Sequence, residues 1–446
     1  MQQGNEILLG WRYRSEAGKN VVDWAAPVYD QGEGHLITVA PTRSGKGVSY
    51  MVPALLNWSG SAVVIDVKGE LAAVTARRRR ELKQKVFIID PFGVTDEKKT
   101  ASLNPLDLLE PDNPRFGADA LMLARMMVGD YSNNKDPFWH ERAEALIAGI
   151  IQFLAANEKK RPRCIDIAEA LERRENSGLF GRMADNEKPL SVQMRECKYR
   201  VARAGGAVLQ KNETRVLTSI LSVASSSMSF VDDGRLGDAL GRSTVSLASL
   251  ASDKPMTVYL VMPPDMLASH GRVLKLWLSV IIAKLARRQG YGGPPTMLFV
   301  DEAAQIGRMD QLLSAVTLMA GYGVRTWSVW QDLSQLQHAY PKEWRTLLNN
   351  SATQLWFGFH NPRMAEEAAD AMGAFSKDEL AKMHKDDAVL LQSGQLPEII
   401  RRPSYLKNPG FAGLFDQNPY VAAPFIDVDE PYIQPENVIG FSGMGR

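Results

Sequence analysis

One short segment, residues 40–47 with the sequence APTRSGKG, constrains the fold more than any other part of the chain. It follows a short apolar, β-branched run at 35–39 and precedes residues 48–58, which can form a helix apart from Pro53. Such a turn directs successive backbone N–H groups into one concavity at the start of a helix, where phosphate binds. We therefore expect the phosphates of a nucleoside triphosphate to contact six consecutive residues: Thr42, Arg43, Ser44, Gly45, Lys46 and Gly47.

Two positions depart from the general phosphate-loop pattern G-x-x-x-x-G-K-S/T. Ala40 stands in place of the first glycine, and Gly47 stands where a serine or threonine hydroxyl would hold magnesium. The concavity for phosphate is kept, but one metal ligand is missing. The alternative is a Ser-Gly-Lys-Gly turn that only joins a strand to a helix. The rest of the sequence must therefore show whether a second half of a nucleotide site is present.

A second segment, residues 296–302, supplies that half. Its apolar run ends in Asp301, which can hold magnesium directly or through water, and Glu302, which can orient and deprotonate the attacking water. A further strand at 325–330 brings Gln331 to the same sheet edge, where its amide can sense a terminal phosphate or orient water. The alternative for Gln331 is a helix-capping or surface amide.

Apolar strands alternate with helices in both halves of the chain, which predicts an α/β fold with a mostly parallel sheet. We expect further strands at 61–66, 85–90 and 256–262, with 354–359 as the last strand of the sheet. Between them the pattern changes to helices. The predicted organisation is a nucleotide-binding domain at 1–110 and 250–446, interrupted by an all-α domain at 111–249 and ending in a tail that wraps or meets a neighbour.

Charge and cysteine content exclude some classes of function. Lys and Arg total 52 against 51 for Asp and Glu, so net charge favours neither nucleic acid nor membrane. Cys164 and Cys197 lack the spacing of a zinc site or a disulfide framework. The apolar stretches 143–156 and 273–286 are shorter than a bilayer span and are predicted to be core helices.

One run of basic residues has two interpretations. It is either a solvated helix end placed favourably against the helix dipole, or a contact surface for a nucleic-acid backbone. The run comprises Arg77, Arg78, Arg79 and Arg80.

Taken together, these motifs resemble the TraG/VirD-type coupling proteins of type IV secretion and conjugation, which are P-loop motors related to FtsK and HerA. Beside the phosphate loop, the resemblance rests on five short segments: IDVKGE at 65–70, NPLD at 104–107, DPFW at 136–139, VDE at 300–302 and QDLSQL at 331–336. It implies a RecA-like nucleotide domain, the cofactors ATP and Mg²⁺, and an all-α domain that recognises the transferred substrate. This branch of the family looks similar at the position of Gly47. The departure of Gly47 from the general pattern therefore argues less against ATP binding.

The resemblance also implies partners. These are other copies of the chain in a hexameric ring, single-stranded DNA or a relaxase–DNA complex, and type IV secretion channel components at the cytoplasmic face of the bacterial inner membrane. An arginine from a neighbouring subunit completes the site in related motors, and Arg325 is the nearby candidate. Family members usually carry N-terminal transmembrane helices, so this chain is either a piece of a membrane protein or a naturally soluble relative that docks on a membrane partner.

Three functions are compatible with these features. The first is an ATP-driven motor that feeds DNA or a DNA-bound protein towards a secretion channel. The second is a docking receptor in which ATP supports assembly and DNA is never gripped. The third, a monomeric P-loop nucleotide kinase, explains neither the helical insertion nor Gln331.

Overall fold

The computed structural model describes residues 6–421 except 31, 33, 98, 130, 132–135, 158–161, 177–187, 212–213 and 289–291. Its strands are β1 (Leu8–Glu16), β2 (Lys19–Tyr29), β3 (His35–Val39), β4 (Ala62–Asp66), β5 (Lys85–Ile89), β6 (Met256–Val261), β7 (Thr296–Val300), β8 (Val324–Trp330), β9 (Ser351–Trp356), β10 (Asp387–Gln392) and β11 (Glu398–Arg401). They form one eleven-stranded sheet in the order β2-β1-β11-β10-β9-β3-β8-β7-β4-β6-β5.

The part of the sheet from β9 to β5 is parallel, as predicted. Strands β3, β4, β6, β7 and β8 are buried along their whole length, which is why their sequences are runs of apolar and β-branched residues rather than alternating patterns. Parallel strands end at the same edge of a sheet. The turns that follow β3, β7 and β8 are therefore close together, since β8 lies between the other two.

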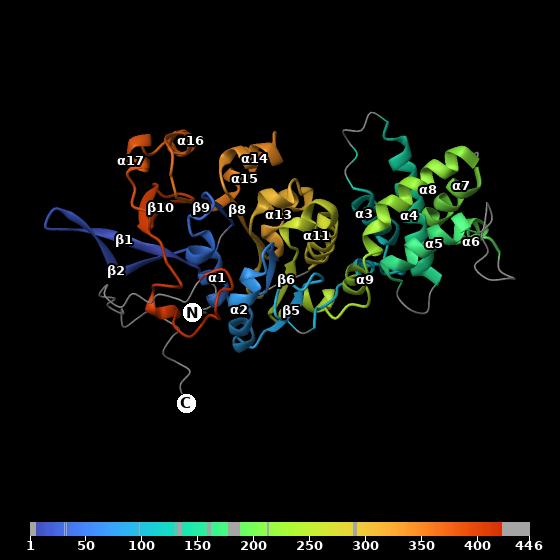
Figure 1. Ribbon diagram of the computed structural model, residues 1–446, viewed down its shortest axis with the longest axis horizontal. Helices are drawn as coiled ribbons and strands as arrows, with labels where there is room; N and C mark the ends of the chain where they lie inside the picture. The colour runs from blue at the N-terminus through green and yellow to red at the C-terminus, as the bar shows by residue number, and fades with distance from the viewer. Residues whose placement is uncertain are drawn as a thin grey trace.

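The other end of the sheet is antiparallel, and the prediction that the strand near 354–359 is the last one was wrong. β10 pairs with β9, β11 pairs with β10, and β1 pairs with β11, so segments from the two ends of the chain extend the same sheet. β1 and β2 form a long hairpin at the outer edge (Figure 1). Its turn contains Ala17 and Gly18, both with positive φ, which suits the right-handed twist of the paired strands.

Helices cover both faces of this sheet. They are α1 (Val52–Asn57), α2 (Glu70–Glu81), α11 (Pro264–Leu285), α12 (Ala303–Ile306), α13 (Asp310–Leu318), α14 (Leu333–Ala339), α15 (Trp344–Asn349), α16 (Pro362–Met372) and α17 (Lys377–Ala381). A widened π-type turn at Gly47–Met51 leads into α1, because Pro53 has no N–H to bond the preceding turn. Among the described helices, α11 is long and apolar enough by composition to cross a membrane, but residues such as Trp277 and Ile281 are buried in the core.

A helical cluster is inserted between β5 and β6 and lies at the opposite end of the molecule from the β1–β2 hairpin (Figure 1). Gly149 and Gly205 allow two of its helices to cross closely, because a Cβ on Gly149 would lie 2.7 Å from the Gly205 Cα. An ion pair between Arg287 and Asp119, 2.5 Å long, joins the cluster to the segment after α11. The cluster contains α3 (Phe116–Val128), α4 (Phe138–Asn157), α5 (Cys164–Asn176), α6 (Leu190–Glu196), α7 (Arg200–Lys211) and α8 (Thr214–Met228).

The chain after β11 returns to the parallel part of the sheet and its helices. We call residues 402–421 the C-terminal strap. The Tyr405 amide donates to the Val48 carbonyl at 3.2 Å, and the Asp416 amide donates to the Val74 carbonyl at 3.0 Å. The strap therefore packs against the turn after the phosphate loop and against α2.

Candidate functional site

The segment 40–47 follows β3 as a tight turn that exposes its backbone. Both Arg43 and Gly45 have positive φ, at 61° and 88°, while Ser44 closes the turn by donating from its amide and hydroxyl to the Pro41 carbonyl. Alternation of this kind turns successive N–H groups towards one side, which is the geometry of an anion-binding nest. Thr42 and Arg43 are exposed, whereas Lys46 points into the protein.

Lys46 is the buried cation of this site. Its side chain is 7% exposed, and its Nζ has no hydrogen-bond partner among the described residues. The nearest carboxylate oxygen paired with it is Glu302 Oε1 at 3.6 Å, which is too long for a hydrogen bond. A buried ammonium normally has all its donors engaged, so this arrangement fits an anion that would accept from Lys46.

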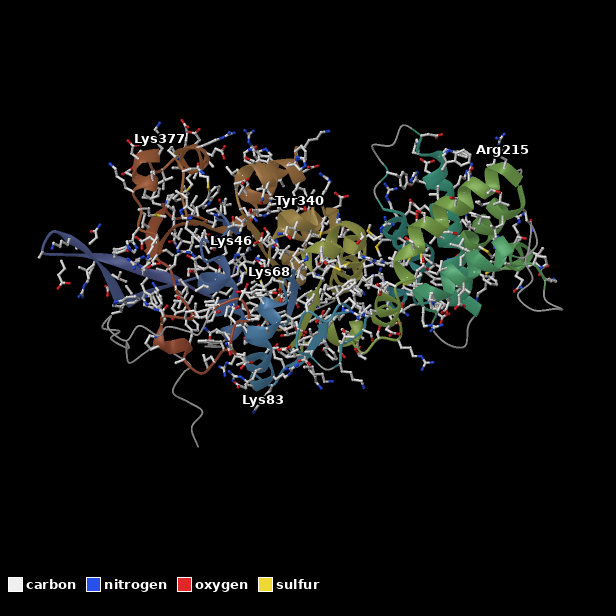
Figure 2. All side chains as sticks on the ribbon, in the orientation of Figure 1. Lys46, Lys68, Lys83, Arg215, Tyr340 and Lys377 are labelled. Carbon is white, nitrogen blue, oxygen red and sulfur yellow. The ribbon has the colours of Figure 1, made fainter. Side chains whose placement is uncertain are left out.

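Glu302 connects Lys46 to the neighbouring strand. The glutamate is 5% exposed, and its Oε2 accepts a 2.7 Å hydrogen bond from Gln331 Nε2. Lys68 Nζ lies 4.0 Å from the other carboxylate oxygen. Figure 2 labels Lys46 and Lys68 in the same part of the molecule. The structure thus brings together the predicted phosphate lysine, the predicted base and the predicted sensing amide, from the turns after β3, β7 and β8.

Two carboxyl groups beside them are hard to ionise. Burial, followed by the charges of Glu302, Asp66 and Glu70, raises the pKa of Asp301 to about 7. Burial also raises the pKa of Asp66 to about 6, although Asp66 accepts backbone hydrogen bonds from Ala72 and Lys68. A divalent cation next to Asp301 would favour its ionised form. Asp301, the residue that the sequence assigned to Mg²⁺, therefore offers one carboxylate that fits this cation, while the described residues contain no group of three or more such ligands.

The backbone of Glu302 is strained at this place. Glu302 adopts φ 51° and ψ 48°, a left-handed conformation that is uncommon for a residue other than glycine. A conformation of this type costs about 1–3 kcal/mol and is kept where the surrounding structure requires it. Here it turns the chain directly after Asp301 and places the Glu302 carboxylate next to Lys46 and Gln331.

A cavity of about 450 Å³ adjoins the outer side of the phosphate loop. Ser44 and Gly45 form one wall, and Arg402 and Leu406 of the C-terminal strap form another, with Trp24 at the side. This cavity has room for a nucleoside beyond the phosphates.

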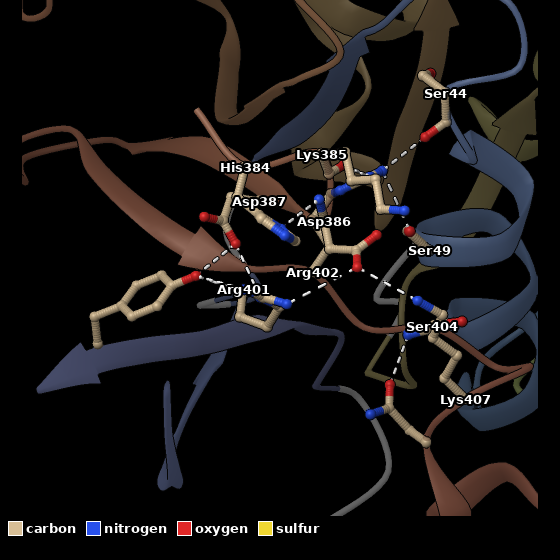
Figure 3. A network of polar contacts seen from close by, with 12 residues as sticks. Ser44, Ser49, His384, Lys385, Asp386, Asp387, Arg401, Arg402, Ser404 and Lys407 are labelled. Carbon is tan, nitrogen blue, oxygen red and sulfur yellow. Dashed lines mark hydrogen bonds and ion pairs between the residues drawn. The ribbon is translucent and has the colours of Figure 1, made fainter. Parts of the chain in front are cut away.

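Arg402 fixes the position of the strap against the loop. Its guanidinium donates to the Ser44 carbonyl at 3.0 Å and to the Lys385 carbonyl (Figure 3). It also lies 4.0 Å from the centre of the Phe357 ring. Sequence reasoning missed Arg402 because no recognisable motif surrounds it. The residue becomes evident only when β11 pairs with β10 and brings it to the loop.

The prediction for Arg325 was wrong. Arg325 lies near the start of β8, at the opposite end of that strand from Gln331, and is 3% exposed. Its Nη2 forms a 2.8 Å ion pair with buried Asp30, whose other oxygen accepts from Thr353. The guanidinium is therefore engaged within the chain, at the end of β8 away from Gln331.

The prediction of a DNA-contacting surface at residues 77–80 was also wrong for Arg79. This side chain is 0% exposed and donates to the carbonyls of Leu55, Trp58 and Gly60. The other three arginines have acidic partners within the chain: Arg77 with Asp416 and Glu81, Arg78 with Glu81, and Arg80 with Glu97. The run therefore belongs to the packing of α2, with three members at the surface.

The known proteins that this chain resembles are conjugative transfer proteins and their relatives. A family model described as "Type IV secretory system Conjugative DNA transfer" matches residues 10–376. The chain is 27% identical over 328 residues to the conjugal transfer protein TraG of Escherichia coli, covering 69% of this chain and 49% of that protein. It is 26% identical over 359 residues to VirD4 of Rhizobium radiobacter, covering 79% and 50%. The chain spans about half the length of these curated relatives.

Solved structures share the fold. The bacterial conjugative coupling protein TrwBdeltaN70 matches with a TM-score of 0.62 at 16% identity, covering 90% of this chain and 96% of that one. The plasmid coupling protein TrwB in complex with ADP and Mg²⁺ matches with a TM-score of 0.62 at 15% identity, covering 90% and 95%. Because the family model extends from β1 to the turn before α17, through both halves of the site, the chain belongs to the type IV secretory system conjugative DNA transfer family.

Proposed function

We propose that this protein is an ATP-driven coupling protein of type IV secretion, which moves DNA or a DNA-bound protein towards the secretion channel. The observation that carries the proposal is the meeting of Lys46, Glu302 and Gln331 from three different turns of the parallel sheet. A site that only joined a strand to a helix would not bury an ammonium group without a hydrogen-bond partner.

Each residue has a role that follows from its position. The amides of residues 42–47 and Lys46 bind the phosphates, and the adjoining cavity takes the nucleoside. Asp301 holds Mg²⁺, which when bound neutralises charge on the phosphates. Glu302 accepts a proton from the attacking water, and Gln331 orients the Glu302 carboxylate through its 2.7 Å hydrogen bond.

The partners follow from family membership and are part of the proposal. Copies of the chain would assemble into a hexameric ring, engage single-stranded DNA or a relaxase–DNA complex, and dock on type IV secretion channel components. The membrane would be reached through a segment that precedes this part of the longer relatives or through a partner protein. The helical cluster, at the far end of the molecule from the β1–β2 hairpin, is the proposed surface for substrate recognition (Figure 1).

Glu302→Gln tests the catalytic assignment. The substitution keeps the size of the side chain and removes its ability to accept a proton, so ATP should still bind while turnover falls about 100-fold or more. Turnover is measured with and without single-stranded DNA, and ATP binding by calorimetry. Glu398→Gln, which changes a glutamate paired with Arg12 near the hairpin, is the matched control. Wild-type turnover in Glu302→Gln would remove Glu302 as the base.

The docking receptor remains the second candidate, and the internal pairing of residues 77–80 favours it. Those arginines were the sequence evidence for a grip on DNA, and the structure engages them within the chain. DNA binding by the assembled ring whose affinity falls steeply with salt supports the motor. ATP-dependent assembly without any DNA binding supports the receptor.

A further inference from the structure

The phosphate loop lacks one oxygen ligand for magnesium, because Gly47 stands where the general pattern has a hydroxyl. A side-chain oxygen from another part of the chain lies beside Gly47. A Cβ built on Gly47 would have Glu70 Oε1 as its neighbour, at 3.7 Å. A carboxylate oxygen from another element thus lies next to the position that a serine Cβ would occupy.

The turn before α2 holds Glu70 in this place. Gly69 adopts a left-handed conformation with φ 70°, and a Cβ there would meet Val94 and Thr95 side chains at 3.0 Å. Asp66 Oδ2 accepts from the Ala72 amide at 2.8 Å, which ties the first turn of α2 to the end of β4. Glu70 is the first residue of that helix, so its carboxylate extends from a rigid corner.

The surroundings of Glu70 point to a bound ligand. Lys46, the residue next to Gly47, is 7% exposed and its Nζ lacks a hydrogen-bond partner among the described residues. Glu70 follows β4 and Asp301 follows β7, and these strands pair with Ile65 opposite Val300, so both residues lie at the same edge of the sheet. Glu70 Oε1 itself accepts a 2.7 Å hydrogen bond from Asn418 Nδ2 of the C-terminal strap. This hydrogen bond is the competing explanation for the position of the Glu70 carboxylate.

We propose that Glu70 supplies the oxygen that Gly47 cannot, and binds the Mg²⁺ of the bound nucleotide directly or through one water. Glu70 and Asp301 then approach the metal from the ends of β4 and β7, which are paired neighbours in the sheet. This inference rests on the proposed function, because it requires a nucleotide at the phosphate loop.

The test measures metal binding rather than turnover. ADP affinity is measured by calorimetry in Mg²⁺ and in EDTA, and Mn²⁺ binding to the ADP-loaded protein is followed by electron paramagnetic resonance. Glu70→Gln should weaken Mn²⁺ binding about 10-fold or more, with ADP affinity in EDTA unchanged or tighter. Adding Gly47→Ser to Glu70→Gln should restore Mn²⁺ binding to within about 3-fold, since the new hydroxyl would supply an oxygen ligand beside the position of Glu70 Oε1.

Asn418→Ala is the matched control, because it removes the contact with the strap and leaves the carboxylate. The proposal is overturned if Asn418→Ala reproduces the effect of Glu70→Gln, or if Glu70→Gln weakens ADP equally with and without metal. It is also overturned if wild-type ADP binding does not respond to Mg²⁺. Failure of the wild-type protein to bind any nucleotide would instead refute the proposed function. Lys46→Ala tests that function separately, because it removes the ammonium proposed to bind phosphate.

Discussion

The two ends of β8 carry polar side chains in opposite situations. At the start of the strand, Arg325 is buried and paired with Asp30, which also accepts from Thr353. Just after its end, Gln331 donates to Glu302, which lies beside a Lys46 ammonium without a hydrogen-bond partner among the described residues. At the first end, the Arg325 Nε and Nη2 atoms donate to the Gly34 carbonyl and to Asp30, and Nη1 has no partner among the described residues, whereas at the second end the whole Lys46 ammonium has none. The candidate site differs from the buried ion pair in degree, because two of the three Arg325 nitrogens are engaged and the Lys46 nitrogen is not.

The same contrast distinguishes two buried cations. Arg79 has its guanidinium surrounded by backbone carbonyls and the Gln84 side chain. Lys46 is buried almost as deeply, yet its Nζ approaches one carboxylate oxygen at 3.6 Å. Burial alone therefore does not identify function, because both cations are buried and only one is short of partners.

The largest expected effect lies at the paired end of β8. Arg325→Leu leaves Asp30 as a buried charge without its cation, so the free energy of unfolding should fall by about 3–5 kcal/mol. Urea unfolding measures the loss, and Asp30→Asn combined with Arg325→Leu should recover part of it. An ATPase defect with unchanged stability would contradict a structural role and would support Arg325 as a residue of the catalytic site.

A smaller loss of stability is expected in α2. Arg79→Leu leaves the Leu55 and Gly60 carbonyls without their buried donor, which should reduce the free energy of unfolding by about 3 kcal/mol. Arg80→Ala, at a half-exposed ion pair with Glu97, should change it by less than about 1 kcal/mol. Thermal and urea unfolding compare the two variants. Equal losses would show that the buried contacts of Arg79 are not the reason for its position.

The third effect is expected for Gln331→Ala, and it is an effect on turnover rather than on stability. Removing its amide releases the Glu302 carboxylate, so turnover should fall about 100-fold, equivalent to about 2.7 kcal/mol, while stability changes by less than about 1 kcal/mol. Steady-state ATPase assays and urea unfolding provide the two values. A large loss of stability with normal turnover per folded protein would make Gln331 a structural residue like Arg325.

Strand spacing explains why Arg325 was misassigned. It lies six positions before Gln331 and looks close in sequence, but a strand rises about 3.3 Å per residue, so six positions separate the two by about 20 Å. The strands β10 and β11 were missed for a different reason. Gly, Pro and polar residues surround both strands, and β11 has only four residues, so their pattern is hidden until β9 and β1 provide pairing partners.

The sequence by itself determined the parallel half of the sheet and the meeting of three motifs at its edge. Apolar strand runs predict a sheet buried on both faces, and parallel strands must deliver the residues after them to one edge. Lys46, Glu302 and Gln331 could therefore be assigned before any coordinates were known.

Only the tertiary structure decided which polar groups have partners. Arg79 is buried because carbonyls from residues 55, 58 and 60 converge on it, and Arg402 reaches the phosphate loop because β11 brings it there. Glu70 lies beside Gly47 because α2 starts at the end of β4. Hydrogen bonds and charges act over a few ångströms between segments far apart in sequence, so local patterns do not contain them.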